Sequence, residues 1–141
     1  MKFRLFILAA AIALSACSKA VHTDHAPSKP AYSVISVVHF ATRSAALDRT
    51  ARSILSNAAA TLEKDTALTV EVAGHADSRN TDAFNMALAQ RRAASVQKYL
   101  VKKGINANRL SIKSYGESQP VASNDTKAGM AKNRRAELRT R

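Results

Sequence analysis

Four segments of the chain carry the hydrophobic and polar pattern of β-strands. Each is short, rich in β-branched or alternating apolar residues, and bounded by glycine or polar residues, as half-buried strands are. The four segments are residues 32–40, 68–73, 110–115 and 134–139. Two longer segments, 48–64 and 82–103, instead repeat apolar residues every three or four positions, which is the spacing of one helix face. Gly104 follows the second helix as its expected C-cap.

The order of these elements, β-α-β-α-β-β, predicts an α/β (α+β) two-layer sandwich, in which two main helices pack on a small mixed sheet. Residues 118–132 are polar and are expected to form a connection without regular structure. With 141 residues, of which 46% are hydrophobic, the chain has room for one ordinary domain with a real core. We expect this domain to occupy residues 32–141.

The N-terminal segment carries the pattern of a bacterial signal peptide, which we place at residues 1–16. Two basic residues precede a run of ten uncharged apolar residues, 5–14, about half the length that a bilayer-spanning helix needs. The run ends in Leu14-Ser15-Ala16-Cys17, which resembles the lipobox of bacterial lipoproteins. That resemblance implies cleavage before Cys17 and lipidation of this residue, the only cysteine of the chain. The alternative is an ordinary signal peptide followed by a coincidental cysteine.

Residues 17–31 are then expected to be the lipidated cysteine and a flexible tether. The segment contains Pro27 and Pro30, small polar residues and no apolar periodicity, as linkers do. Ser18 follows the cysteine, where, by resemblance to enterobacterial sorting, an Asp would favour retention in the inner membrane. The sequence therefore predicts a lipid anchor in the outer membrane and a folded domain that faces the periplasm.

The chain is strongly basic, with 22 Lys and Arg residues against 10 Asp and Glu residues and a formal charge of +12. Such a balance favours an anionic partner, although a cation-rich surface that serves solubility alone explains it too. No aromatic-interleaved basic strand or zinc-finger spacing accompanies the charge, so nucleic acid is not indicated. A single cysteine allows no internal disulfide and no cysteine-based metal cluster, and we expect neither a metal nor a cofactor.

The second predicted helix carries a charge on its apolar side. Its apolar stripe consists of Phe84, Leu88, Val96, Tyr99 and Leu100. Arg92 falls near the middle of this stripe, whereas Arg91 lies at its edge. A charge that points inward must be paired or face a ligand, because burying an unpaired charge is costly. From periodicity alone, an Arg92 that snorkels to solvent or forms a structural ion pair is as good an explanation as a binding role.

Asp77 favours the binding role for Arg92. It lies in the polar loop 75–81, after a predicted strand and immediately before the helix that carries Arg92. A strand end and the start of the next helix converge in space, so the two side chains are expected to flank one pocket. A carboxylate beside a guanidinium matches a zwitterionic amino-acid head group, with Asp binding the ammonium and Arg the carboxylate. The alternative is a direct Asp77–Arg92 ion pair without a ligand.

These residues belong to a longer pattern. Gly74-His75-Ala76-Asp77, then Asn85, Leu88 and Arg91-Arg92-Ala93, and finally Asn133-Arg134-Arg135 resemble the OmpA-like peptidoglycan-binding domain family. The match runs in order from Val37 to Leu138, and with a lipobox the chain resembles the family's lipoprotein form, the peptidoglycan-associated lipoproteins (Pal). The resemblance implies the fold of the OmpA C-terminal domain. It also implies that Asp77 and Arg92 bind the diaminopimelate of an uncrosslinked peptidoglycan stem peptide.

The same resemblance assigns supporting roles around that pair. Asn85 would form a hydrogen bond, Leu88 would pack, and Arg134 or Arg135 would border the groove. The two arginines are equally well explained as structural charges or as charges that steer the polymer. The full expected ligand-binding set is Asp77, Arg92, Asn85, Leu88, Gly74, His75 and Arg134. Three positions depart from the family pattern: this chain has Ala41 where the family usually has Asp, Asn80 where it has Gly, and Met130 where it has Arg. Ala41 removes a loop acid near the pocket, whereas Asn tolerates a glycine's left-handed backbone better than most residues.

A catalytic role lacks the residues it would need. His75 lies beside Asp77, but no Ser or Cys nucleophile element or metal-ligand cluster accompanies it, so we do not expect an enzyme. Two non-enzymatic functions remain. One is a Pal-like tether between the outer membrane and the wall, with Tol-type envelope proteins as possible partners. The other is an accessory lipoprotein that fixes a secretion, conjugation or motility apparatus to the wall, and the short tether keeps this alternative open.

Overall fold

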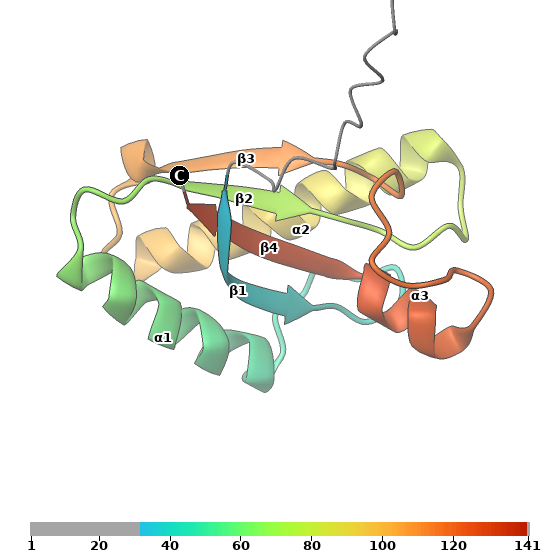
Figure 1. The fold of residues 1–141 in the computed structure, drawn as a ribbon, viewed down its shortest axis with the longest axis horizontal. Helices are drawn as coiled ribbons and strands as arrows, with labels where there is room; N and C mark the ends of the chain where they lie inside the picture. The colour runs from blue at the N-terminus through green and yellow to red at the C-terminus, as the bar shows by residue number, and fades with distance from the viewer. Residues whose placement is uncertain (1–31, 141) are drawn as a thin grey trace, which may run out of the picture.

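The computed structural model describes residues 32–140, and the predicted signal peptide, Cys17 and the tether lie outside them. Within this range the chain forms four strands, three α-helices and one short 3₁₀ helix. In chain order these are β1 (Ser33–His39), α1 (Arg49–Lys64), β2 (Val70–Gly74), α2 (Asp82–Lys102), η1 (Ala107–Arg109), β3 (Leu110–Ser114), α3 (Lys127–Asn133) and β4 (Arg135–Thr140). Figure 1 shows these elements around a single sheet.

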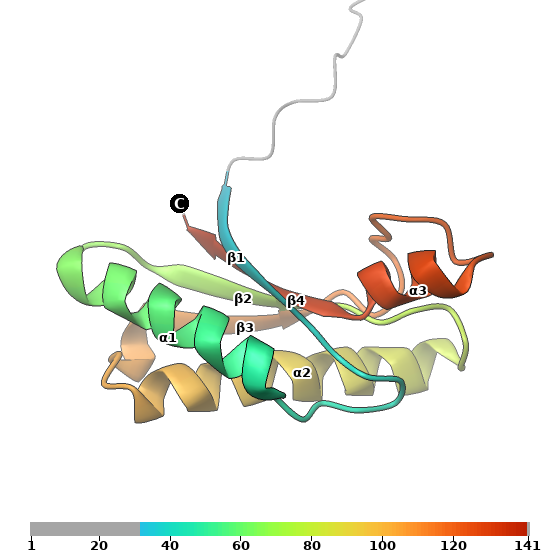
Figure 2. The same cartoon turned by 90° about the horizontal axis from the view of Figure 1, so that it is seen from below.

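The sheet has the order β1-β4-β2-β3, so the last strand of the chain lies in its interior. β4 is antiparallel to both β1 and β2, whereas β2 and β3 are parallel and are connected through α2. Helices α1 and α2 lie along one face of the sheet, and α3 lies near the start of β4, away from α2 (Figure 2). The predicted two-layer α/β sandwich with a mixed sheet is confirmed.

The two long helices begin and end where their sequences provide caps. The side chain of Asp48 accepts a hydrogen bond from the backbone N–H of Ala51 at the start of α1, and Thr81 accepts from Phe84 at the start of α2. At the end of α2, Gly104 has a φ of +100°, which glycine adopts without strain. Its N–H donates to the carbonyl of Val101, and the N–H of Ile105 donates to the carbonyl of Leu100. This is a Schellman motif, so the predicted glycine cap is confirmed.

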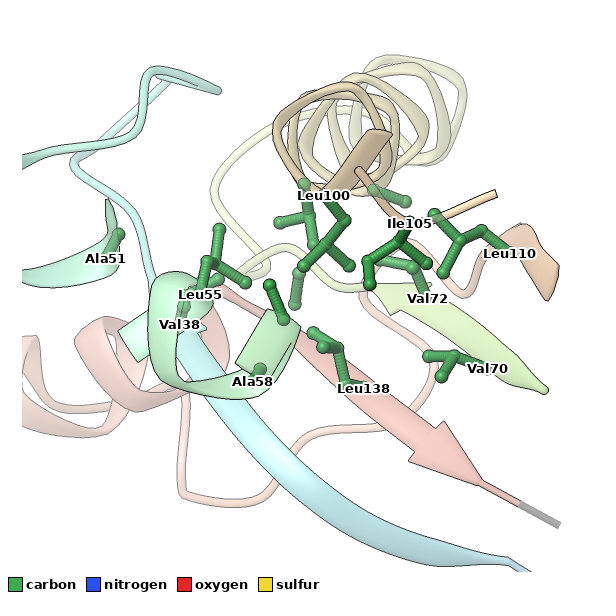
Figure 3. Packing of buried hydrophobic residues seen from close by; sticks show 14 of the residues in the cluster. Val38, Ala51, Leu55, Ala58, Val70, Val72, Leu100, Ile105, Leu110 and Leu138 are labelled. Atoms are coloured by element: carbon green, nitrogen blue, oxygen red, sulfur yellow. The ribbon is translucent and has the colours of Figure 1, made fainter. Parts of the chain in front are cut away.

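The hydrophobic core lies between the two long helices and the sheet (Figure 3). Aliphatic side chains dominate it, and among residues 32–140 Phe40 is the one aromatic residue of this cluster that is buried. The larger members include Val38, Leu55, Leu62, Val70, Val72, Val96, Leu100 and Leu138. Burying each such side chain contributes roughly 1.5–3 kcal/mol. Within residues 32–140, no helix combines the length and the hydrophobicity needed to cross a bilayer.

One predicted segment differs in the structure. Residues 118–132, expected to be a connection without regular structure, contain most of α3. Thr126 caps this helix by accepting from the N–H of Gly129, and a Cβ at Gly129 would come within 1.8 Å of the Ser123 carbonyl oxygen. The buried positions of α3 are Gly129 and Asn133. The prediction was wrong there because a seven-residue helix that buries a glycine and an amide shows no apolar periodicity.

Candidate functional site

Asp77 and Arg92 line one pocket of about 240 Å³. Asp77 comes from the loop after β2, and Arg92 comes from the middle of α2. The loop between β1 and α1 supplies a third wall of the pocket. The remaining lining residues are Thr42, Arg43, Arg79, Asn80 and Leu88. The structure thus brings together the acid and the inward-pointing arginine that the sequence analysis singled out.

Arg92 is 0% exposed and is held by backbone carbonyl groups. Its Nε donates to the carbonyl of Ser44 at 2.9 Å, its Nη1 to that of His75 at 2.8 Å, and its Nη2 to that of Ala41 at 3.1 Å. The guanidinium also lies over the Phe40 ring, 5.3 Å from the centroid. Burial lowers the pKa of Arg92 to about 10, so it is charged at neutral pH. Arg92 therefore neither snorkels nor needs an ion pair, since carbonyl dipoles surround its charge.

A guanidinium has five N–H donors, and the carbonyl groups use one on each nitrogen of Arg92. One N–H on each of the two terminal nitrogens remains outside these bonds. Two N–H groups of one guanidinium can bind both oxygens of a carboxylate. The three carbonyl groups also restrain the rotamer of the Arg92 side chain, so these two N–H groups are held in a fixed orientation.

Asp77 is 5% exposed and forms its ion pairs with Arg79 and Arg134. Its Oδ2 accepts from Nη2 of Arg79 at 2.6 Å and from Nη1 of Arg134 at 3.3 Å, while Oδ1 accepts from the Arg79 backbone. Burial alone would raise the pKa of Asp77, but these hydrogen bonds outweigh burial and hold the pKa below its ordinary value. Among residues 32–140, no direct Asp77–Arg92 ion pair is formed, so that alternative was wrong.

Two arginines connect the loops on either side of the pocket. Nη2 of Arg79 donates to the hydroxyl of Thr42 at 3.0 Å, and Nη2 of Arg43 donates to the side-chain oxygen of Asn80 at 3.0 Å. Among the described non-glycine residues, the left-handed backbone occurs at Arg43, with a φ of 56°, and not at Asn80. Arg79 and Arg43 are pocket residues that the sequence analysis missed. A surface arginine in a polar loop has no periodicity that could have identified it.

Asn85 and Leu88 lie on α2 below the pocket. Asn85 is fully buried, and its Nδ2 donates to the carbonyl of Asn80 and to the Glu117 carboxylate. Its Oδ1 is buried without a partner among the described residues. Leu88 lines the pocket, whereas Asn85 does not. Leu88 thus supplies an apolar wall, and Asn85 holds the loop that carries Asn80.

Gly74 and His75 support the pocket through the backbone. A Cβ at Gly74 would lie 2.0 Å from the carbonyl oxygen of Ala89, so the close packing of β2 on α2 requires glycine. The ring of His75 stacks on Tyr115 with a centroid distance of 5.3 Å, and only the carbonyl of His75 bonds to Arg92. Burial, Arg135 and Arg139 outweigh Glu137 and lower the pKa of His75 to about 3. His75 is therefore neutral near pH 7.

The basic residues near the pocket separate into two groups. Arg134 donates to the carbonyl of Phe40 at 2.9 Å and to Asp77 but does not itself line the pocket, whereas Arg135 pairs with Glu137. Arg91 is exposed, as its edge position indicated. Phe84, which the helical spacing placed in the apolar stripe, is 36% exposed. The prediction for Phe84 was wrong because α2 extends beyond the core at its N-terminal end, where Arg91 covers the ring instead.

Among residues 32–140, no group of three or more His, Cys, Asp or Glu side chains is placed to hold a metal ion.

A family model described as "OmpA family" matches residues 39–134. The chain is 55% identical over 71 residues to "Outer membrane porin F" of Pseudomonas fluorescens, which covers 50% of this chain and 22% of that protein. It is 47% identical over 70 residues to "Peptidoglycan-associated lipoprotein" of Pseudomonas putida, covering 50% and 42%. The chain thus spans less than half the length of these relatives.

Solved structures of similar fold include proteins with three different names. The peptidoglycan-associated lipoprotein of Burkholderia pseudomallei has a TM-score of 0.72 and 30% identity, covering 74% of this chain and 89% of that chain. The C-terminal domain of Helicobacter pylori MotB has a TM-score of 0.71 and 29% identity, covering 76% and 84%. The cell wall anchor of the T6SS from Pseudomonas aeruginosa has a TM-score of 0.64 and 31% identity, covering 73% and 77%.

Proposed function

Because the chain belongs to the OmpA family, we propose that it binds peptidoglycan non-covalently through the diaminopimelate of an uncrosslinked stem peptide. The observation that carries this proposal is that a buried carboxylate, Asp77, and a buried guanidinium, Arg92, line one pocket. Several similar proteins are named peptidoglycan-associated lipoproteins. The free end of diaminopimelate carries an ammonium and a carboxylate on one carbon, which is the head group that this pair matches.

Each part of that head group has a partner in the pocket. Asp77 binds the ammonium, because its carboxylate stays ionised at neutral pH. Arg92 binds the carboxylate through the N–H donors that the carbonyl groups leave over. Leu88 lies against the methylene chain of the ligand. The domain itself performs no chemistry in this proposal and needs no cofactor, since recognition by charge and shape is sufficient for an anchor.

Co-sedimentation of the full chain with isolated sacculi, in mild detergent, tests the proposal. We expect the protein to pellet with diaminopimelate-type sacculi and to stay in the supernatant with lysine-type sacculi, because lysine lacks the second carboxylate. Asp77→Asn keeps the shape of the side chain but removes its charge, and it should abolish pelleting while circular dichroism remains unchanged. Asp82→Asn, which removes an exposed acid at the start of α2, is the matched control. Equal pelleting of both variants would refute the proposal.

We further propose that Cys17 carries a lipid that anchors the chain in the outer membrane, so that binding to peptidoglycan ties this membrane to the wall. Similar proteins carry the names outer membrane porin F, outer membrane protein A and peptidoglycan-associated lipoprotein. A Cys17→Ala variant should then leave the membrane fraction or accumulate as an uncleaved precursor. Membrane fractionation identical to that of the wild type would contradict the lipid anchor without affecting the sacculus result.

A second function is favoured by the solved structures, which include MotB and the cell wall anchor of the T6SS. In this alternative the same pocket fixes a secretion, conjugation or motility apparatus to the wall. The genes that flank this one separate the two functions. Neighbouring tol genes favour a Pal-like role with Tol-type partners, whereas a secretion or motility operon favours the accessory role.

A further inference from the structure

The charges around the pocket are not balanced. Its lining holds the guanidinium groups of Arg43, Arg79 and Arg92 but only one carboxylate, that of Asp77. Arg134 also donates to Asp77. Among residues 32–140, the ion pairs at the pocket are those of Asp77 with Arg79 and Arg134. One carboxylate therefore serves several cations, and the side chains that line the pocket carry a surplus of positive charge.

Arg79 and Arg92 differ in how firmly they are held. Arg92 is fully buried and bonded to carbonyl groups of two loops. The side chain of Arg79 is 41% exposed, and its polar partners are Asp77 and the hydroxyl of Thr42. An exposed arginine changes rotamer at little cost, whereas a buried one bonded to three carbonyl groups does not. Of the two guanidinium groups, Arg79 is the one that can exchange its partner.

A ligand ammonium that binds Asp77 has to share its carboxylate with Arg79. Nη2 of Arg79 lies 2.6 Å from Oδ2 of Asp77, so an ammonium at the same oxygen is close to a like charge. Like charges at such distances repel strongly in a partly enclosed site. A ligand with one ammonium and one carboxylate satisfies Asp77 and Arg92 but leaves Arg79 with Thr42 alone. A ligand with a second carboxylate also supplies Arg79 with a new partner.

We propose that Arg79 is a specificity-determining residue, which exchanges Asp77 for a second carboxylate of the ligand. The inference rests on the proposed function and adds to it a preference among stem peptides. In a tripeptide stem that ends in diaminopimelate, the terminal carboxylate is free in addition to the zwitterionic head group. When that terminal group is an amide, the head group is unchanged but the second carboxylate is lost. The pocket therefore selects stems with a free terminal carboxylate.

Two peptides that differ at this one group test the proposal. The probes are a stem tripeptide ending in diaminopimelate and the same tripeptide with a terminal carboxamide, titrated calorimetrically into the full chain in detergent. Because Arg79 is partly exposed, we expect the free acid to bind about fivefold more tightly, the upper range for an exposed ion pair. Arg79→Gln should bring this ratio close to one. Arg91→Gln removes an exposed arginine one helical turn from the pocket residue Leu88 and should keep the wild-type ratio.

The outcomes separate this inference from the proposed function. If the wild type binds both peptides equally, or if Arg79→Gln retains the preference, the role of Arg79 is overturned while peptidoglycan binding stands. If Arg91→Gln lowers the ratio as much as Arg79→Gln does, general electrostatics explains the preference, and the specific role of Arg79 is again overturned. If the wild type binds neither peptide, the proposed function fails and the inference fails with it.

Discussion

Two clusters of arginine and carboxylate side chains lie beside β4, and they differ in how completely their charges are paired. The sheet cluster consists of Arg135, Glu137 and Arg139, which alternate along β4 on the sheet face opposite the long helices. Arg135 donates to one oxygen of Glu137 at 2.6 Å, and Arg139 donates to the other at 2.8 Å. All three residues are buried.

The surroundings of the sheet cluster complete its pairing. The guanidinium of Arg139 lies 4.4 Å from the centroid of the Tyr32 ring and 4.8 Å from that of Tyr115. It also lies 3.6 Å from the carboxylate of Glu71. The pocket cluster, which consists of Asp77, Arg79, Arg92 and Arg134, instead keeps an exposed arginine and unused donors on a buried one. Arginine and carboxylate side chains thus stabilise the fold in the sheet cluster, where every charge has a partner within the protein. The same residue types form a candidate binding site in the pocket cluster, where some N–H donors have no partner within the protein.

The largest effect that we expect comes from removing the shared carboxylate of the sheet cluster. Glu137→Gln leaves the buried Arg135 without a counter-charge and leaves Arg139 with that of Glu71 alone, and breaking a buried pair in this way costs about 3–5 kcal/mol. Urea unfolding followed by circular dichroism at low temperature measures this loss. Glu63→Gln on the exposed side of α1 is the control and should change stability by less than about 0.5 kcal/mol. Equal stability of the two variants would show that the sheet cluster does not stabilise the fold.

Arg92→Lys tests whether the pocket cluster also has a structural role. A lysine ammonium keeps the charge but cannot reach the carbonyl groups of Ala41, Ser44 and His75 with a planar fork. We expect a loss of about 2 kcal/mol, because buried carbonyl groups are left unsatisfied, together with loss of sacculus binding. Arg91→Lys is the matched control and should change neither property. A variant at position 92 that is fully stable but does not bind would restrict Arg92 to ligand recognition.

The buried His75 next to the sheet cluster makes stability depend on pH. Its pKa in the folded protein is about 3 instead of 6.5, so between these values the unfolded chain binds a proton that the folded chain does not. The free energy of unfolding should therefore fall as the pH drops below 6.5, by at most about 1.4 kcal/mol per pH unit. Urea midpoints at pH 7, 5.5 and 4.5 measure the slope. A His75→Gln variant should lose most of this slope and keep a smaller one from His39 and Glu137, whose pKa values are also lowered. An unchanged slope would assign the effect to other groups.

Salt should have the smallest effect, and it should distinguish the two clusters. The sheet cluster is buried and is screened little, whereas the partly exposed pocket cluster is within reach of counter-ions. Raising NaCl from about 50 to about 500 mM should weaken sacculus binding by roughly threefold while the urea midpoint stays constant. Binding assays and unfolding curves at both salt concentrations make the comparison. A salt-independent affinity would mean that apolar contacts, such as those of Leu88, dominate binding.

The sequence by itself determined the four strands, the two long helices and the side of α2 on which Arg92 lies. All of these follow from local periodicity, because the spacing of apolar residues decides which helix face is buried. The cap at Gly104 is equally local, since it depends on one residue's access to the left-handed backbone. α3 was missed because its seven residues bury Gly129 and Asn133, neither of which contributes to an apolar pattern.

The partners of the charged residues were decided only by the tertiary structure. Arg92 bonds to carbonyl groups of Ala41 and Ser44, which lie 51 and 48 positions away in the chain, and a backbone carbonyl leaves no trace in a sequence pattern. Asp77 pairs with Arg79 and Arg134 rather than with Arg92, because side-chain reach and loop shape select among several nearby cations. Arg135 and Arg139 likewise pair with Glu137 because all three side chains lie on the sheet face that the long helices do not cover. The periodicity of the sequence indicates on which face of an element a charged side chain lies, whereas tertiary packing determines which group it pairs with.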